Sequence, residues 1–90
     1  MNAAYRAKSA QARATVAIRM LKTRKRLSRD FDACFEMFDG AEVVREIRRR
    51  SRSDSALVQA LIKHGCDYWL KPDYFPNEGL PPLQQDMSFH

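Results

Sequence analysis

The sequence predicts an all-α protein, a three-helix antiparallel bundle followed by an extended C-terminal tail rich in proline and aromatic residues. All four prolines lie after residue 71, so nothing in the first seventy residues forces a helix to end. Apolar side chains in that part recur at helical spacings, and no run alternates as a half-buried strand does. The aromatic segment after Trp69 is punctuated by proline and has no further apolar element to pack against.

Three helical segments account for the first seventy residues. Residues suited to cap helix N-termini precede each of them. The predicted spans are Ala3–Arg26, Asp30–Arg50 and a third helix from Ser53 or Asp54 to Trp69. The apolar face of the second helix turns near Gly40, which predicts either a bend or burial on two sides. One domain is therefore expected over residues 1–70, with the tail over residues 71–90.

Charge is distributed unevenly along the chain. Residues 1–29 hold nine of the 16 Lys and Arg and no acid, whereas the remaining residues hold all 11 acids. The first third therefore carries +9 and the rest −4, within a net charge of +5. Such a block indicates an acidic partner, a nucleic acid or an anionic surface. Its Ala-, Ser- and Arg-rich composition is also typical of a mitochondrial targeting segment.

Motifs for catalysis or metal binding do not occur in the sequence. His64 and His90 are the only histidines, and Cys34 and Cys66 lack the spacing of metal ligands or of a disulfide framework. There is no glycine-rich phosphate loop and no pair of carboxylates placed for acid–base chemistry. No apolar run is long enough for a transmembrane helix. We therefore expect a non-enzymatic protein with no metal site, no cofactor of its own and at most a peripheral membrane association.

The high density of arginine near residue 50 makes binding to nucleic acid an alternative hypothesis. The run from Arg48 to Ser53 holds four arginines, as an RNA-contacting mitochondrial ribosomal protein would. The aromatics, however, lie in the apolar stripes and are not interleaved with the basic residues as base stacking requires. Binding to nucleic acid is therefore the alternative and not the expectation.

A different resemblance covers almost the whole chain. Arg19 follows Ala17 and Ile18 in a triplet trailed by basic residues, and Ile47 stands 28 residues after it. Three helices with this basic first helix resemble the LYR-motif family of mitochondrial proteins, whose Leu-Tyr-Arg triplet is likewise followed by basic residues and a distant anchor. Of the triplet, this chain keeps only the arginine.

Within that family the chain is most similar to the accessory subunits of the membrane arm of respiratory complex I. The segments that carry this similarity are Ala3–Ala7, Leu61–Gly65 and Pro72–Pro76, followed by Gly79. The resemblance implies a non-catalytic accessory subunit on the matrix side of the mitochondrial inner membrane. Another LYR adaptor or an assembly factor is the near alternative.

The resemblance also implies a partner, the mitochondrial acyl carrier protein, which is acidic and brings its own acyl-phosphopantetheine group. The basic residues expected to bind it are Arg19, Lys22, Arg26, Arg45 and Arg48. The residues expected to line a space for the acyl chain are Val16, Met20, Phe31, Phe35, Phe38, Val44, Ile47 and Leu61. Trp69, Tyr74 and Phe75 are expected to contact neighbouring membrane-arm subunits.

Overall fold

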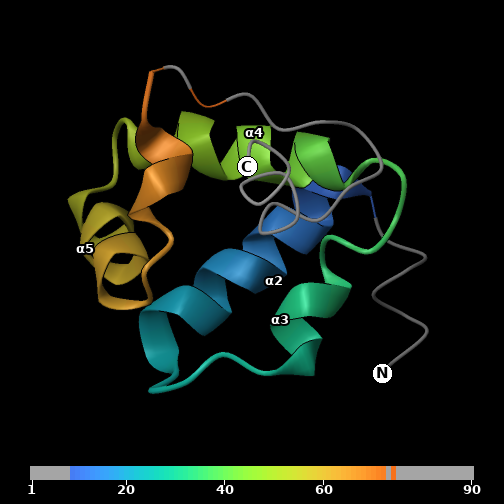
Figure 1. Cartoon of the computed structure of the whole chain (residues 1–90), viewed down its shortest axis with the longest axis horizontal. Coiled ribbons are helices and arrows are strands. Elements are labelled where there is room, and N and C mark those ends of the chain that lie inside the picture. The colour runs from blue at the N-terminus through green and yellow to red at the C-terminus, as the bar shows by residue number, and fades with distance from the viewer. Residues whose placement is uncertain (1–8, 73, 75–90) are drawn as a thin grey trace, which may run out of the picture.

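The computed structural model describes residues 9–72 and 74, and all regular secondary structure within them is helical (Figure 1). The elements are α2 (Ala10–Thr23), α3 (Arg29–Ala33), α4 (Gly40–Ser51), α5 (Ser55–Lys63) and a 3₁₀ turn, η1 (Asp67–Leu70). The all-α fold class is therefore confirmed. The predicted helix start at Ala3 and the tail residue Phe75 lie outside the described residues.

α2 begins at a side-chain cap and buries one face. The Ser9 hydroxyl accepts a hydrogen bond from the Ala12 N–H at 3.2 Å, which satisfies one of the free donors of the first turn. Small alanine side chains on the buried face allow close approach, and α2 makes its most extensive helix–helix contact with α4. The helix ends at Thr23, earlier than predicted, because Arg24 adopts an extended conformation.

The second predicted helix is interrupted, and this corrects the continuous span Asp30–Arg50. Residues 34–39 separate the five-residue α3 from α4. A Cβ at Gly40 would collide with the backbone carbonyl oxygen of Phe35, so the backbone at residue 40 packs directly against the backbone at residue 35. This turn is tighter than the bend in a continuous helix that the sequence predicts. Asp39 precedes α4 but makes no capping bond, because its carboxylate is paired with Arg13 instead.

The third predicted helix is shorter than expected, because the chain leaves the helix at Gly65. Gly65 has φ +74°, a left-handed conformation that glycine adopts without strain. The N–H of Cys66 then donates to Leu61 O at 2.8 Å and that of Gly65 to Ile62 O at 3.1 Å, closing the helix end. η1 follows and carries Trp69 back onto the core.

The helices are arranged differently from the antiparallel bundle that the sequence predicts. α2 and α4 start on the same side and diverge, and α5 with η1 lies where they separate (Figure 1). Polar contacts agree with this arrangement. Arg50 of α4 hydrogen-bonds to residues in the first half of α2, and Asp54, which follows α4, accepts a hydrogen bond from Lys22 near the end of α2. The connection through α3 returns the chain to the start of α2, so α4 runs in the same general direction as α2.

Candidate functional site

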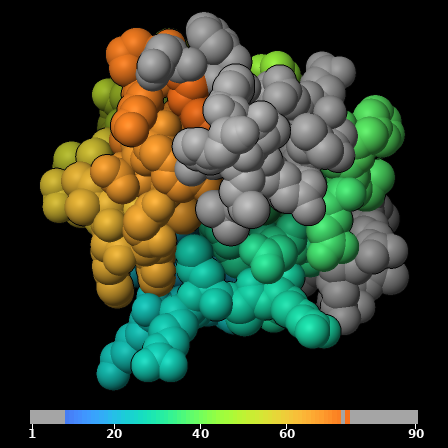
Figure 2. Space-filling view, in the orientation of Figure 1, coloured from blue at the N-terminus to red at the C-terminus, as the bar shows by residue number. Residues whose placement is uncertain are grey.

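A basic surface lies at the end of α2 and in the linker that follows it. Arg19, Lys22 and Arg26, three of the predicted partner-binding residues, are all exposed there. Other exposed basic side chains of the same stretch are Arg24, Lys25 and Arg29. Long side chains of this teal segment project from the body of the molecule (Figure 2). The stretch from residue 19 to 29 contains no acid, so it presents a concentrated positive charge.

One member of this surface is held in place by an ion pair. Lys22 Nζ lies 2.7 Å from Asp54 Oδ2, and both side chains are about one third exposed. The hydrogen bond from Lys22 is the main reason that the pKa of Asp54 is lowered, and the N–H of Leu57 adds to it. Asp54 is also the N-cap of α5, so this carboxylate joins the end of α2 to the start of α5.

The other two predicted binding residues lie elsewhere. Arg48 is half-buried and donates to the carbonyl oxygens of Tyr74 at 2.6 Å and Lys71 at 3.4 Å. Arg45 is exposed beside the first turn of α2, near Ala10. Because a helix rises about 1.5 Å per residue, Ala10 and Lys22 are roughly 18 Å apart along α2. The five predicted residues therefore do not form one surface.

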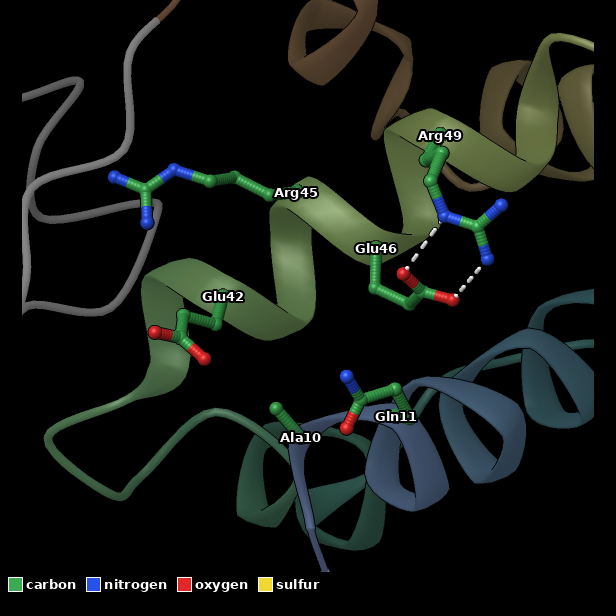
Figure 3. A pocket seen from close by; sticks show the side chains of 6 residues that line it. All are labelled: Ala10, Gln11, Glu42, Arg45, Glu46 and Arg49. Atoms are coloured by element: carbon green, nitrogen blue, oxygen red, sulfur yellow. Dashed lines mark hydrogen bonds and ion pairs between the residues drawn. The ribbon is translucent and has the colours of Figure 1, made fainter.

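Arg45 lines a shallow hollow between α2 and α4 (Figure 3). The hollow has a volume of about 290 Å³ and is lined by Ala10, Gln11, Glu42, Arg45, Glu46 and Arg49. Its lining holds two carboxylates and two guanidinium groups, so their formal charges cancel. An open hollow with this balance has no evident preference for an anion or a cation.

Glu46 organises the arginine run at the end of α4. Its carboxylate accepts hydrogen bonds from Arg49 at 3.0 and 2.6 Å and from Arg50 Nε at 2.7 Å. These bonds lower the pKa of Glu46 from 4.5 to about 2. Arg50 also donates to Thr15 Oγ1 at 2.8 Å and Gln11 O at 3.1 Å. The i,i+3 and i,i+4 spacing was a sequence signal for these pairs that our interpretation of the run missed.

The predicted acyl-chain-lining residues are mostly packed against one another. Six of them are buried in the core, namely Met20, Phe31, Phe35, Val44, Ile47 and Leu61. Val16 is half-buried against the core. Phe38 is 78% exposed, so it lines no internal space in this structure.

Trp69 lies in an aromatic cluster and not on the surface, which corrects its predicted role in contacting another subunit. It is 3% exposed, with its ring centroid 6.2 Å from that of Phe31 and 5.4 Å from that of Phe35. Tyr74, also predicted to contact a neighbour, is half-buried and packs edge-on against Tyr68 at 5.6 Å. Phe31 of α3 and Phe35 just after it are the apolar partners that the sequence interpretation lacked for this segment.

Arg13 is the polar residue that sequence reasoning missed most clearly. It is 1% exposed, donates to Cys34 O at 3.2 Å and pairs with Asp39 Oδ2 at 2.5 Å. Its partners are 21 and 26 residues away, and nothing in the local sequence distinguishes it from the exposed Arg19. Asp39 Oδ1 accepts no hydrogen bond from the part of the chain that the structure describes.

The two thiols are buried and unreactive in character. Burial raises the pKa of Cys34 and of Cys66 to about 11, so both are protonated at neutral pH. Within residues 9–72 and 74, no group of three His, Cys, Asp or Glu side chains lies close enough to hold a metal ion. None of the helices described there is long and apolar enough to cross a bilayer.

No protein-family model, curated protein or solved structure matches the chain.

Proposed function

We propose that this chain is a non-catalytic adaptor of the LYR type that binds an acidic carrier protein through the basic surface at the end of α2. The observation that carries the proposal is the stretch from Arg19 to Arg29, which holds six basic residues, all exposed, and no acid. In the complete proposal the carrier is the mitochondrial acyl carrier protein. The chain then acts as an accessory subunit of the membrane arm of complex I, on the matrix side of the inner membrane.

The geometry of α2 suits an acidic helix on the partner. Arg19 on α2 and Arg26 in the linker are exposed on either side of Lys22, which is already paired with Asp54, so carboxylates of the partner would meet Arg19 and Arg26. Exposed arginines also speed the encounter with an acidic protein. Arg48 takes no part in this contact, because it is bonded to the carbonyl oxygens of Lys71 and Tyr74.

The acyl-phosphopantetheine group of the carrier would reach the core beside α3. The six buried lining residues already pack together, so entry of an acyl chain requires one element to move. α3 is the best candidate, since it is five residues long and has no extensive backbone contact with another helix. Its attachment depends on Phe31 and its ring contacts with Phe35 and Trp69.

The segment after η1 serves in this proposal as the contact to neighbouring membrane-arm subunits. Arg48 holds the start of this segment in place, because it donates hydrogen bonds to the carbonyl oxygens of Lys71 and Tyr74. Beyond that point Phe75 is the predicted contact residue, and three of the four prolines follow it and limit the entropy lost when this part of the chain binds.

The test measures binding of the purified full-length chain to acyl carrier protein, with and without an acyl chain. Reversal of charge in the Arg19→Glu, Arg26→Glu double variant is expected to weaken binding at least about tenfold. The matched control is Arg52→Glu with Lys63→Glu, which reverses two exposed charges outside this surface. Equal weakening by both pairs, or no binding of the unmodified chain, would contradict the proposal.

A further inference from the structure

The basic surface at the end of α2 already holds one carboxylate of this chain. Asp54 Oδ2 lies 2.7 Å from Lys22 Nζ, although the two residues are 32 positions apart in the sequence. Both side chains are about one third exposed, so a second protein can reach the pair. The end of α2 lies beside α5, whose N-cap is Asp54 (Figure 1). Asp54 therefore occupies a cation that this surface would otherwise offer to an acidic partner.

Asp54 uses its two carboxylate oxygens for different purposes. Oδ1 accepts a hydrogen bond from the Leu57 N–H at 3.1 Å and so caps α5, whereas Oδ2 binds Lys22. The hydrogen bond from Lys22 is the first cause of the lowered pKa of Asp54, so this carboxylate is ionised at neutral pH. Because the cap needs only Oδ1, Lys22 can leave Oδ2 while the first turn of α5 stays capped.

Other contacts hold α5 against α2. Leu21 of α2 and Leu57 and Leu61 of α5 are fully buried in the same core. At the other end of α5, the His64 ring N–H donates to Leu21 O at 3.1 Å. Ion pairs as exposed as Lys22 with Asp54 contribute little to stability. We therefore expect the packing of α5 on α2 to survive the loss of this pair.

We propose that Asp54 is a built-in competitor, a carboxylate of the chain that occupies Lys22 until a carboxylate of the acidic partner displaces it. The inference deepens the proposed function and rests on its basic surface. Arg19 and Arg26 are exposed on either side of Lys22, with no acid between them in the sequence. A partner that meets these arginines brings further carboxylates close to Lys22. The surface therefore favours partners with several neighbouring carboxylates over partners with one.

The experiment removes the charge of Asp54 and keeps the cap of α5. Asn and Ser cap helices about as well as Asp, so Asp54→Asn and Asp54→Ser both leave an acceptor for the first turn. Each variant of the full-length chain is expected to bind acyl carrier protein about two- to fivefold more tightly than the unmodified chain, measured by isothermal titration calorimetry. Urea denaturation of the same variants checks that the fold is retained.

The matched control repeats Asp54→Asn in a chain that carries Lys22→Met. Competition requires Lys22, so this chain is expected to show only the smaller gain that follows from removing one negative charge near the surface. The difference between the gains in the two backgrounds measures the coupling of Asp54 to Lys22. A gain of equal size with and without Lys22 would overturn the competitor.

An octaglutamate peptide separates this inference from the proposed function, because it offers neighbouring carboxylates without a carrier. Tighter binding of the peptide by Asp54→Asn that requires Lys22, with no binding of the carrier, would support the competitor and contradict the proposed function. Carrier binding that is unchanged or weakened in both Asp54→Asn and Asp54→Ser would overturn the competitor and leave the proposed function standing. Failure of every variant to bind either probe would overturn both.

Discussion

Arg13 and Asp39 form the most consequential residue pair in the structure. The guanidinium is 1% exposed and the carboxylate 24% exposed, so removal of the arginine leaves a charge poorly solvated. Loss of one partner of a buried pair costs roughly 3–5 kcal/mol. For Arg13→Met we expect the free energy of unfolding to fall by about 3 kcal/mol, the lower end of this range, as measured by urea denaturation.

The matched control is Arg19→Met, which removes an exposed arginine from the same helix. It is expected to change stability by less than about 0.5 kcal/mol. Equal losses for the two variants would show that the buried pair does not stabilise the turn between α3 and α4.

The bonds of Glu46 to Arg49 and Arg50 make part of the free energy of unfolding depend on pH. Its pKa is lowered from 4.5 to about 2 by its bonds to Arg49 and Arg50, so folding favours the ionised carboxylate. The stabilisation is therefore complete above pH 4.5 and lost as pH falls toward about 2. Denaturation of the unmodified chain and of Glu46→Gln should show a stability difference that shrinks over this range. A difference that stays constant from pH 7 to 2 would rule out this assignment.

At the scale of the elements, two glycines end or begin helices for different reasons. Gly40→Ala places a methyl group against the Phe35 carbonyl, which is backbone and cannot rotate away. Gly65→Ala meets open space and is strained only by its φ of +74°. We expect losses of about 2–3 kcal/mol at Gly40 and about 1–2 kcal/mol at Gly65, measured by thermal or urea unfolding. The reverse order would mean that the turn after Phe35 can relax.

The docking of η1 rests on Trp69. Trp69→Ala removes a buried ring that contacts Phe31 and Phe35, so a loss of about 3–5 kcal/mol is expected. Phe38→Ala serves as the comparison, because its exposed ring contributes little to the folded core. If unfolding experiments found the two variants equally stable, Trp69 would not hold η1 against the core, and its predicted contact with another subunit would be favoured instead.

For the whole molecule, the fold class and much of the core could be predicted from the sequence. Val44, Ile47 and Leu61 were expected among the apolar residues between the helices, and all three are buried. The absence of proline predicted helices before residue 71, and every regular element within residues 9–70 is helical. These features depend on local periodicity, which a single sequence records.

Features that depend on distant contacts could not be predicted. The break before Gly40 arises from a close approach to Phe35, and the burial of Arg13 arises from Asp39, 26 residues away. The direction of α4 follows from the path through α3, which a continuous second helix would not allow. The predicted basic residues do not form one surface for the same reason. Arg45 lies beside the first turn of α2, whereas Lys22 lies in its last turn.

A pull-down from mitochondrial membranes tests whether the chain is an adaptor for an acidic acyl carrier protein. The tagged chain is recovered at about 0.5 M salt, where exposed charges are screened within ~4–5 Å, and intact partners are weighed by mass spectrometry. We expect to recover a small acidic protein that carries the mass of phosphopantetheine with an acyl chain, together with hydrophobic respiratory subunits, because salt does not screen the burial of the acyl chain. Loss of every partner at that salt, with RNA or ribosomal proteins recovered at low salt, would contradict it.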